Sequence, residues 1–190
     1  MPRLLKVTIW GLAALTGVAA GVVAQRMLSA GDMPLMTLGI DKPIAGKGLL
    51  GQPVPKLRLA DSQGVVRQLT DWRGTGVLIN FWATWCPPCR EEIPDLVRLH
   101  QALTHSGFAV IGVALDEVRP VQEFLQALAV PYTNLMAPGM SAMAVNRQFD
   151  NPAGMLPYSV AVNRQGRIVA THLGVLSPAR MRAMAQLTLQ

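Results

Sequence analysis

The sequence predicts an α/β domain in which helices flank a central mixed sheet. Two runs, Gly76–Trp82 and Phe108–Leu115, are apolar except for Asn80, and each is followed by an amphipathic stretch. Such runs are typical of parallel strands buried on both faces. Further on, Tyr158–Val162 and Arg167–Thr171 flank the turn Asn163–Gly166, a pattern typical of an antiparallel hairpin. We therefore expect parallel strands first and an antiparallel hairpin last.

Residues 1–26 predict an N-terminal membrane anchor. Val7–Ala24 is an uncharged run of 18 residues, which is close to the minimum length of a transmembrane helix. Arg3 and Lys6 precede it, so the positive-inside rule leaves the N-terminus in the cytoplasm. A cleavable signal peptide is the alternative. We expect a single pass through the inner (cytoplasmic) membrane, with the folded domain on the periplasmic or extracytoplasmic side.

Residues 27–48 predict a linker, and residues 49–190 predict one folded domain. The linker carries Gly, Pro, Asp and Lys with no sustained hydrophobic period. The domain opens with Leu57–Ala60 and Val65–Leu69, two short strands around a turn, which predict an N-terminal β-hairpin extension.

The remaining elements follow from apolar periodicity and from helix start and stop signals. A helix is expected from Cys86 to near Gly107, and a closing helix begins at Ser177-Pro178, with serine as N-cap and proline at the first helical position. Between them we expect a helix at Pro120–Leu128, a short strand at Tyr132–Met136 and a short helix at Met140–Phe149.

The charge distribution gives no support to nucleic-acid binding. The formal net charge is +6, but three of the basic residues flank the N-terminal apolar run. From Asp32 onward there are 14 basic and 11 acidic residues. No cluster of Lys and Arg lines one face, so we expect no nucleic-acid partner.

The two cysteines, Cys86 and Cys89, are the chemical centre of the sequence. They stand two residues apart, directly after a buried-strand pattern and at the start of a helical one. Unpaired backbone N–H groups at a helix N-terminus favour the thiolate, which is the species that attacks disulfides. The spacing therefore predicts a redox-active dithiol that needs no cofactor.

Other uses of the cysteines fit less well. A structural zinc site needs four ligands, and His100, His105 and His172 offer no pairing of that kind. A purely structural disulfide across so short a loop would add little stability. A copper-delivery protein, for which His172 is available, generally has a wider cysteine spacing. We therefore expect no metal site, and keep copper delivery as an alternative of a different class.

Residues 80–94 resemble the active-site segment of thioredoxin-fold proteins. Over about residues 49–190 the chain resembles the membrane-anchored TlpA/ResA/CcmG-type thiol–disulfide oxidoreductases. The resemblance is carried by Gly51–Pro55, by Trp82–Cys89, by Glu92 and by Leu156-Pro157 before a late strand. It implies a thioredoxin-like fold.

The resemblance also implies roles for the cysteines and their neighbours. Cys86, the first on the helix, is expected to be the nucleophile, and Cys89 the resolving thiol. Trp82 and Trp85 are expected to form apolar walls around the thiols. Pro87 lies between the cysteines, and together with Trp85 it is expected to contact the substrate.

The matching proline in the family, here Pro157, is cis and packs against the cysteine pair. The backbone of Leu156 is then expected to pair with an extended partner chain. Cytochrome-maturation members often show Gly-Ala-Pro-Glu in this loop, whereas this chain has Gly154-Met155-Leu156-Pro157-Tyr158. That difference weakens an assignment to cytochrome c maturation.

Glu92 matches a proton-handling carboxylate of the ResA and TlpA type. Thioredoxins proper usually carry a buried aspartate where this chain has Asn80, and an amide cannot accept the proton. Glu92 is therefore expected to take it. The alternative is a solvated acid that merely favours the helix N-terminus.

The sequence thus predicts an exported thiol–disulfide oxidoreductase that reduces selected disulfide-bearing envelope proteins and receives electrons from an upstream membrane donor. A disulfide-introducing oxidase is the alternative with the same motif. Four methionines in the second half of the domain can either pack in the core, which we expect, or form a pliable docking surface. They are Met136, Met140, Met143 and Met155.

Overall fold

The computed structural model describes residues 47–190 of the chain. Within this range no helix has the length and apolar character needed to cross a membrane. The predicted anchor at residues 1–26, and nearly all of the predicted linker, lie outside the described residues.

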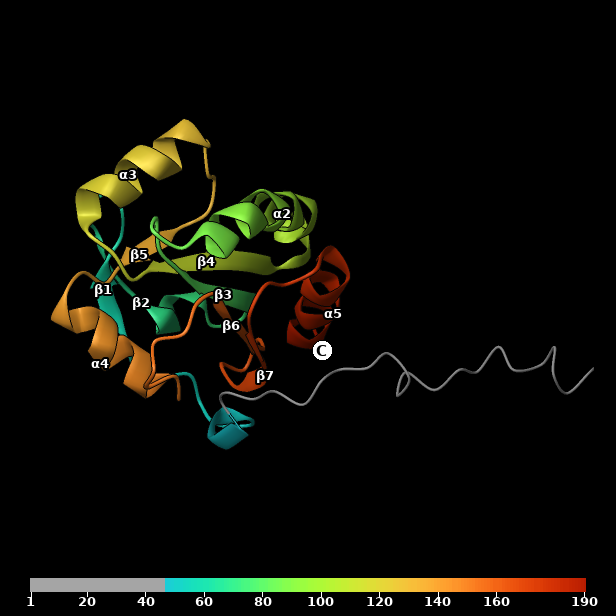
Figure 1. Cartoon of the computed structure of the whole chain (residues 1–190). Helices are drawn as coiled ribbons and strands as arrows, with labels where there is room; N and C mark the ends of the chain where they lie inside the picture. Colours follow the sequence, from blue (N-terminus) through green and yellow to red (C-terminus); the bar gives the residue numbers. More distant parts are fainter. Residues whose placement is uncertain (1–46) are drawn as a thin grey trace, which may run out of the picture. The chain divides into compact units, whose positions relative to one another are not determined.

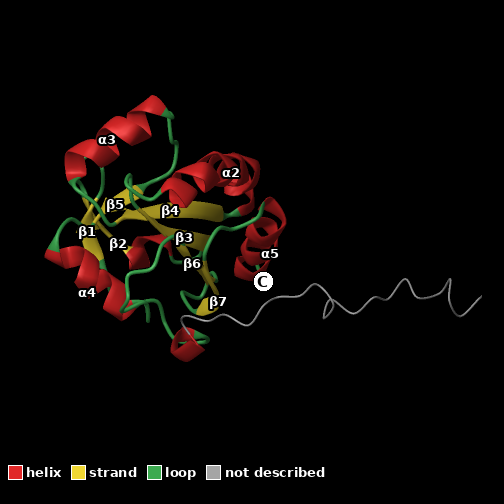
Figure 2. Cartoon of the chain, in the orientation of Figure 1, coloured by secondary structure: helices red, strands yellow, loops and turns green. Residues whose placement is uncertain are grey.

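A five-stranded mixed sheet forms the middle of the domain, with strand order β5-β4-β3-β6-β7 (Figures 1 and 2). The strands β3 (Gly76–Trp82), β4 (Phe108–Ala114) and β5 (Asn134–Met136) run parallel. The hairpin of β6 (Tyr158–Val162) and β7 (Ile168–Leu173) pairs antiparallel with β3 through β6. This confirms the predicted mixed sheet, and the bounds of these strands differ from prediction by at most two residues.

The central strand β3 divides the core between the two faces of the sheet, because successive side chains on a strand point to opposite sides. Val77, Ile79 and Phe81 pack on the face covered by α4 (Met140–Gln148). The alternate positions face three other helices, which are α2 (Pro87–Leu103), α3 (Val118–Ala127) and α5 (Pro178–Thr188). In Figure 1, α4 lies across the sheet from α2 and α3.

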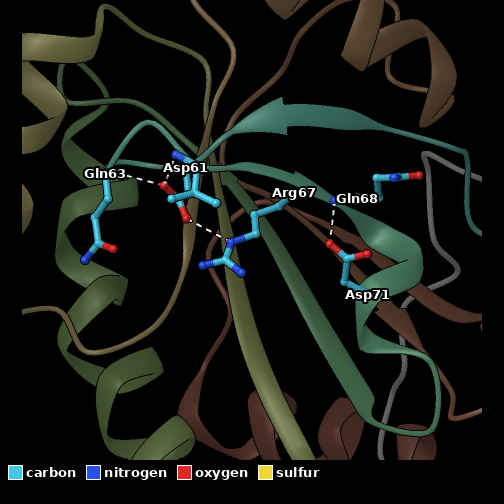
Figure 3. Close-up of polar contacts among 6 residues, drawn as sticks. Asp61, Gln63, Arg67, Gln68 and Asp71 are labelled. Atoms are coloured by element: carbon cyan, nitrogen blue, oxygen red, sulfur yellow. Dashed lines mark hydrogen bonds and ion pairs between the residues drawn. The ribbon is translucent and has the colours of Figure 1, made fainter.

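The predicted N-terminal hairpin is formed by β1 (Arg58–Ala60) and β2 (Val66–Gln68). Asp61 organises its turn, since Oδ1 accepts hydrogen bonds of 2.9 Å from the backbone N–H groups of Gln63 and Val65. Oδ2 of Asp61 accepts a 3.0 Å bond from Nε of Arg67 (Figure 3).

The hairpin is joined to both the next element and the central sheet. The backbone N–H of Gln68 donates to Oδ2 of Asp71 at 2.9 Å, where a 3-10 helix, η3 (Leu69–Trp72), begins (Figure 3). The backbone N–H of Ser62 donates to the carbonyl of Asn134 at 3.0 Å. The hairpin therefore continues onto the edge strand β5.

Candidate active site

Cys86 and Cys89 lie where β3 ends and α2 begins. Cys86 is the N-cap residue of α2, and Pro87 and Pro88 occupy the first turn, where a missing N–H leaves no bond unmade. The two cysteines form a disulfide, with 5.3 Å between their Cα atoms. Cys86 is 5% exposed and Cys89 is fully buried. Cys86 is thus the residue of the pair that is nearer to solvent.

An apolar cluster surrounds the disulfide, and Trp82 is its largest member. Nε1 of Trp82 donates a 3.0 Å hydrogen bond to Oδ1 of Asn134 on β5. The Asn134 side chain lies over Gly112, where an added Cβ would stand 1.8 Å from Oδ1. Trp82 forms the expected wall, whereas Trp85 is 64% exposed and lies at the surface.

Asp116 holds the loop that leads into the cysteines, and it is not among the site residues that the sequence predicted. Oδ2 of Asp116 accepts a 2.9 Å bond from the backbone N–H of Thr84 and a second bond from the Thr84 hydroxyl. The sequence feature that could have indicated Asp116 is its place shortly after β4. Neighbouring parallel strands end at the same edge of a sheet, so a residue after β4 lies near the cysteines that follow β3.

The Leu156–Pro157 peptide bond is cis, as the family resemblance implied. Leu156 is partly buried and packs against the cluster that contains both cysteines. Asn151 supports this loop, because its Oδ1 accepts from the backbone N–H of Met155 at 3.2 Å and its Nδ2 donates to the Met155 carbonyl at 3.0 Å. Nothing in the sequence pattern distinguished Asn151 from an ordinary loop residue.

Glu92 is buried, with 2% of its surface exposed, so the alternative of a solvated helix acid is wrong. Nδ2 of Asn80 donates to Oε1 at 2.7 Å, and the backbone N–H of Leu176 donates to Oε2 at 2.9 Å. Burial raises the pKa of Glu92 to about 7, and the two hydrogen bonds offset part of that rise.

Asn80 occupies a central position beside Glu92. Its Nδ2 also donates to the hydroxyl of Ser159 at 3.2 Å. Among the described residues its Oδ1 has no hydrogen-bond partner. The side chain therefore acts toward Glu92 as a donor.

The methionines divide between core and surface. Met136 is buried in the cluster around the disulfide, as expected. Met140, Met143 and Met155 are exposed, so the prediction of core packing is wrong for these three. The apolar residues of a short helix do not by themselves show which side of the helix packs against the sheet.

No metal ligand set is present within residues 47–190: no group of three or more His, Cys, Asp or Glu side chains is placed to hold an ion. Of the histidines, His172 lies on β7, and its Nε2 is 3.2 Å from the carbonyl oxygen of Val175.

The Redoxin family model matches residues 49–187, a range that includes both cysteines. The thiol–disulfide oxidoreductase ResA of Bacillus cereus is 25% identical over 138 residues, which cover 72% of this chain and 77% of that protein. ResA of Bacillus subtilis is 26% identical over 128 residues, which cover 67% of this chain and 69% of that protein.

The structure is similar to that of a thiol:disulfide interchange protein of the thioredoxin family from Chlorobium tepidum TLS. That chain is 27% identical, with a TM-score of 0.65, and the match covers 73% of this chain and 96% of that one. The similarity in structure therefore spans nearly the whole of the other protein.

Proposed function

Because this chain belongs to the Redoxin family and is a thiol–disulfide oxidoreductase, we propose that it reduces disulfides in selected proteins of the cell envelope through Cys86 and Cys89. The observation that carries this proposal is the disulfide at the N-terminus of α2, in contact with an apolar cluster and within one helical turn of a buried carboxylate.

The first step joins the partner to Cys86. In the reduced protein the Cys86 thiolate, favoured at the helix N-terminus, attacks one sulfur of the partner's disulfide. A bond between Cys86 and the partner forms, the partner's own S–S bond breaks, and one partner thiolate leaves.

The second step releases the partner. The Cys89 thiol loses its proton and attacks the Cys86 sulfur, so that the mixed disulfide breaks and the second partner thiolate leaves. Two electrons have then passed to the partner, which takes up two protons. The protein ends in the disulfide form seen in the structure.

Glu92 is proposed as the group that accepts the Cys89 proton. It lies three residues after Cys89 on the same helix, which is close to one turn. A pKa of about 7 lets the carboxylate accept the proton near neutral pH and give it up again. Asn80 and the Leu176 backbone hold both carboxylate oxygens, so the group is fixed in orientation.

The partner's extended chain is proposed to bind along Leu156 and Pro157. Leu156 packs beside the cysteine cluster, and its backbone is the expected pairing group. Pro87 and Trp85 are both exposed beside Cys86 and supply further contact.

We further propose that residues 1–26 anchor the protein in the inner membrane and that residues 27–48 tether the domain on the exported side. There an upstream membrane donor would return the cysteines to the dithiol. An exported protein whose two cysteines are both in the active site suits a dedicated electron carrier.

The equilibrium reduction potential of the full chain in detergent tests the direction of electron flow. A reductase should equilibrate near the thioredoxin value of about −270 mV, whereas a value near the DsbA figure of about −120 mV would favour the disulfide-introducing oxidase. Alkylation followed by mass spectrometry measures the dithiol fraction in glutathione or dithiothreitol buffers.

A further inference from the structure

Three exposed methionine side chains lie on α4 and on the loop before Pro157. Met140 is 88% exposed, Met143 61% and Met155 48%. Met140 and Met143 are three residues apart on α4 and are therefore neighbours on its surface. We refer to Met140, Met143 and Met155 as the methionine face.

Hydrogen bonds connect the α4 part of this face to the loop part. Nδ2 of Asn151 donates at 3.3 Å to Oδ1 of Asn146, which is on α4, three residues beyond Met143. The same Asn151 binds the backbone N–H and carbonyl of Met155. Gly154 lies against Asn146 so closely that an added Cβ would stand 3.1 Å from Nδ2. Met155 is therefore held beside the α4 turn that follows Met143.

The loop part of the face continues to the cysteines. Leu156, the residue after Met155, packs against the cluster that contains Cys86 and Cys89. A partner whose sulfur reaches Cys86 must contact this region. The methionine face thus extends an interface that thiol–disulfide exchange itself requires.

The composition of these segments suits an apolar occupant. Residues 137–146 and 151–163 contain no charged side chain, and the two charged residues between these segments, Arg147 and Asp150, are both exposed. Depletion of charge, enrichment in Met, and a polar rim are typical of the core of a protein–protein interface. Flexible, polarizable thioethers adapt to apolar side chains of different shape.

We propose that the methionine face binds apolar residues flanking the target disulfide in an extended segment of the partner protein. This inference rests on the proposed function, since the same partner is the one that Cys86 attacks. It adds a selection rule: at equal chemical reactivity, disulfides next to apolar residues react faster than those next to polar ones.

The test compares three disulfide substrates of the reduced full chain in detergent. Two are synthetic disulfide-linked peptides that differ only in having leucines or serines beside the cysteine, and the third is glutathione disulfide. The variants are Met140→Lys/Met143→Lys and the uncharged Met140→Gln/Met143→Gln. Leu128→Lys is the control, because Leu128 is exposed at the end of α3 that leads into β5, away from the edge where the cysteines lie.

We expect wild type to reduce the leucine peptide faster than the serine peptide. Both double variants should slow the leucine peptide on the order of tenfold and leave the serine peptide and glutathione disulfide unchanged. Leu128→Lys should match wild type on all three substrates.

Equal slowing of all three substrates, or no slowing of the leucine peptide, would overturn this inference and leave the proposed function intact. If wild type reduced none of the three substrates, both this inference and the proposed function would be overturned. The alternative occupant of the methionine face is a second copy of this chain, and sedimentation tests for it. A concentration-dependent dimer that the double variants abolish would show that a second copy covers the face, and would overturn this inference.

Discussion

Nδ2 of Asn80 donates a 2.7 Å hydrogen bond to Oε1 of Glu92, linking the middle of β3 to the cysteine-bearing helix α2. Asn80 occupies the position at which thioredoxins proper usually carry a buried aspartate. Here that position orients a carboxylate supplied by the helix. In this chain the carboxylate therefore stands on the helix, and the strand supplies the amide that holds it.

Replacing Asn80 with alanine should raise the pKa of Glu92 above its value of about 7, because the Asn80 hydrogen bond lowers that pKa while burial persists. The pH–rate profile of disulfide exchange should shift to higher pH accordingly. Ser159→Ala is the matched control, since it removes the other acceptor of the same amide without touching Glu92. An unshifted profile for Asn80→Ala would show that Asn80 does not tune Glu92.

Glu92→Gln should slow thiol–disulfide exchange about tenfold or more, since positioned acid–base groups contribute about 10²–10⁴. Stopped-flow rates and the cysteine titration would measure this. Glu91→Gln should have little effect, because the exposed Glu91 side chain lies about 100° round the helix. If the two substitutions behave alike, Glu92 does not handle the proton.

The oxidised protein should lose stability as pH rises through neutrality. The pKa of Glu92 is raised from 4.5 in its ordinary state to about 7 in the fold, so the folded state binds the proton more tightly than the unfolded state does. The stability linked to this proton is fully present below pH 4.5 and is lost as pH rises through about 7.

The loss should be on the order of 3 kcal/mol at most, since one pKa unit corresponds to about 1.4 kcal/mol. Urea unfolding at pH 5 and pH 8 measures it, and Glu92→Gln should remove most of the difference. Tyr132, whose pKa is raised by burial and by the charge of Glu92, stays neutral over this range. A wild type equally stable at both pH values would contradict the burial of an ionisable Glu92.

Cys89→Ala should capture partners as stable mixed disulfides, whereas Cys86→Ala should capture few. Cys86 is the N-cap of α2 and the less buried cysteine, so its thiolate is the more available one. Non-reducing electrophoresis of membranes from cells that express each variant would show the difference. Equal capture by both variants would remove the assignment of nucleophile and resolving thiol.

Local pattern was sufficient for the strands and α-helices and for the redox pair, although the 3-10 helix η3 was not predicted. The run Gly76–Trp82, which is apolar except for Asn80, forms β3 with the predicted bounds, because every residue of this strand is buried and no exposed polar face obscures its ends. Gly166 stands at φ 76° in the turn between β6 and β7, as the hairpin required. Two cysteines at the start of a helix were readable from spacing alone.

Only the tertiary structure decided what surrounds that pair. From the sequence alone, Glu92 could equally be a surface acid. Its surroundings depend on two contacts that span 12 and 84 residues, one with Asn80 on β3 and one with the Leu176 N–H in the segment before α5. The exposure of Met140 and Met143 also depends on the tertiary structure, because α4 packs against the sheet through Val145 and Phe149 and leaves both methionines at the surface. Sequence periodicity determines which residues share a face, but burial and pKa depend on which distant element packs against that face.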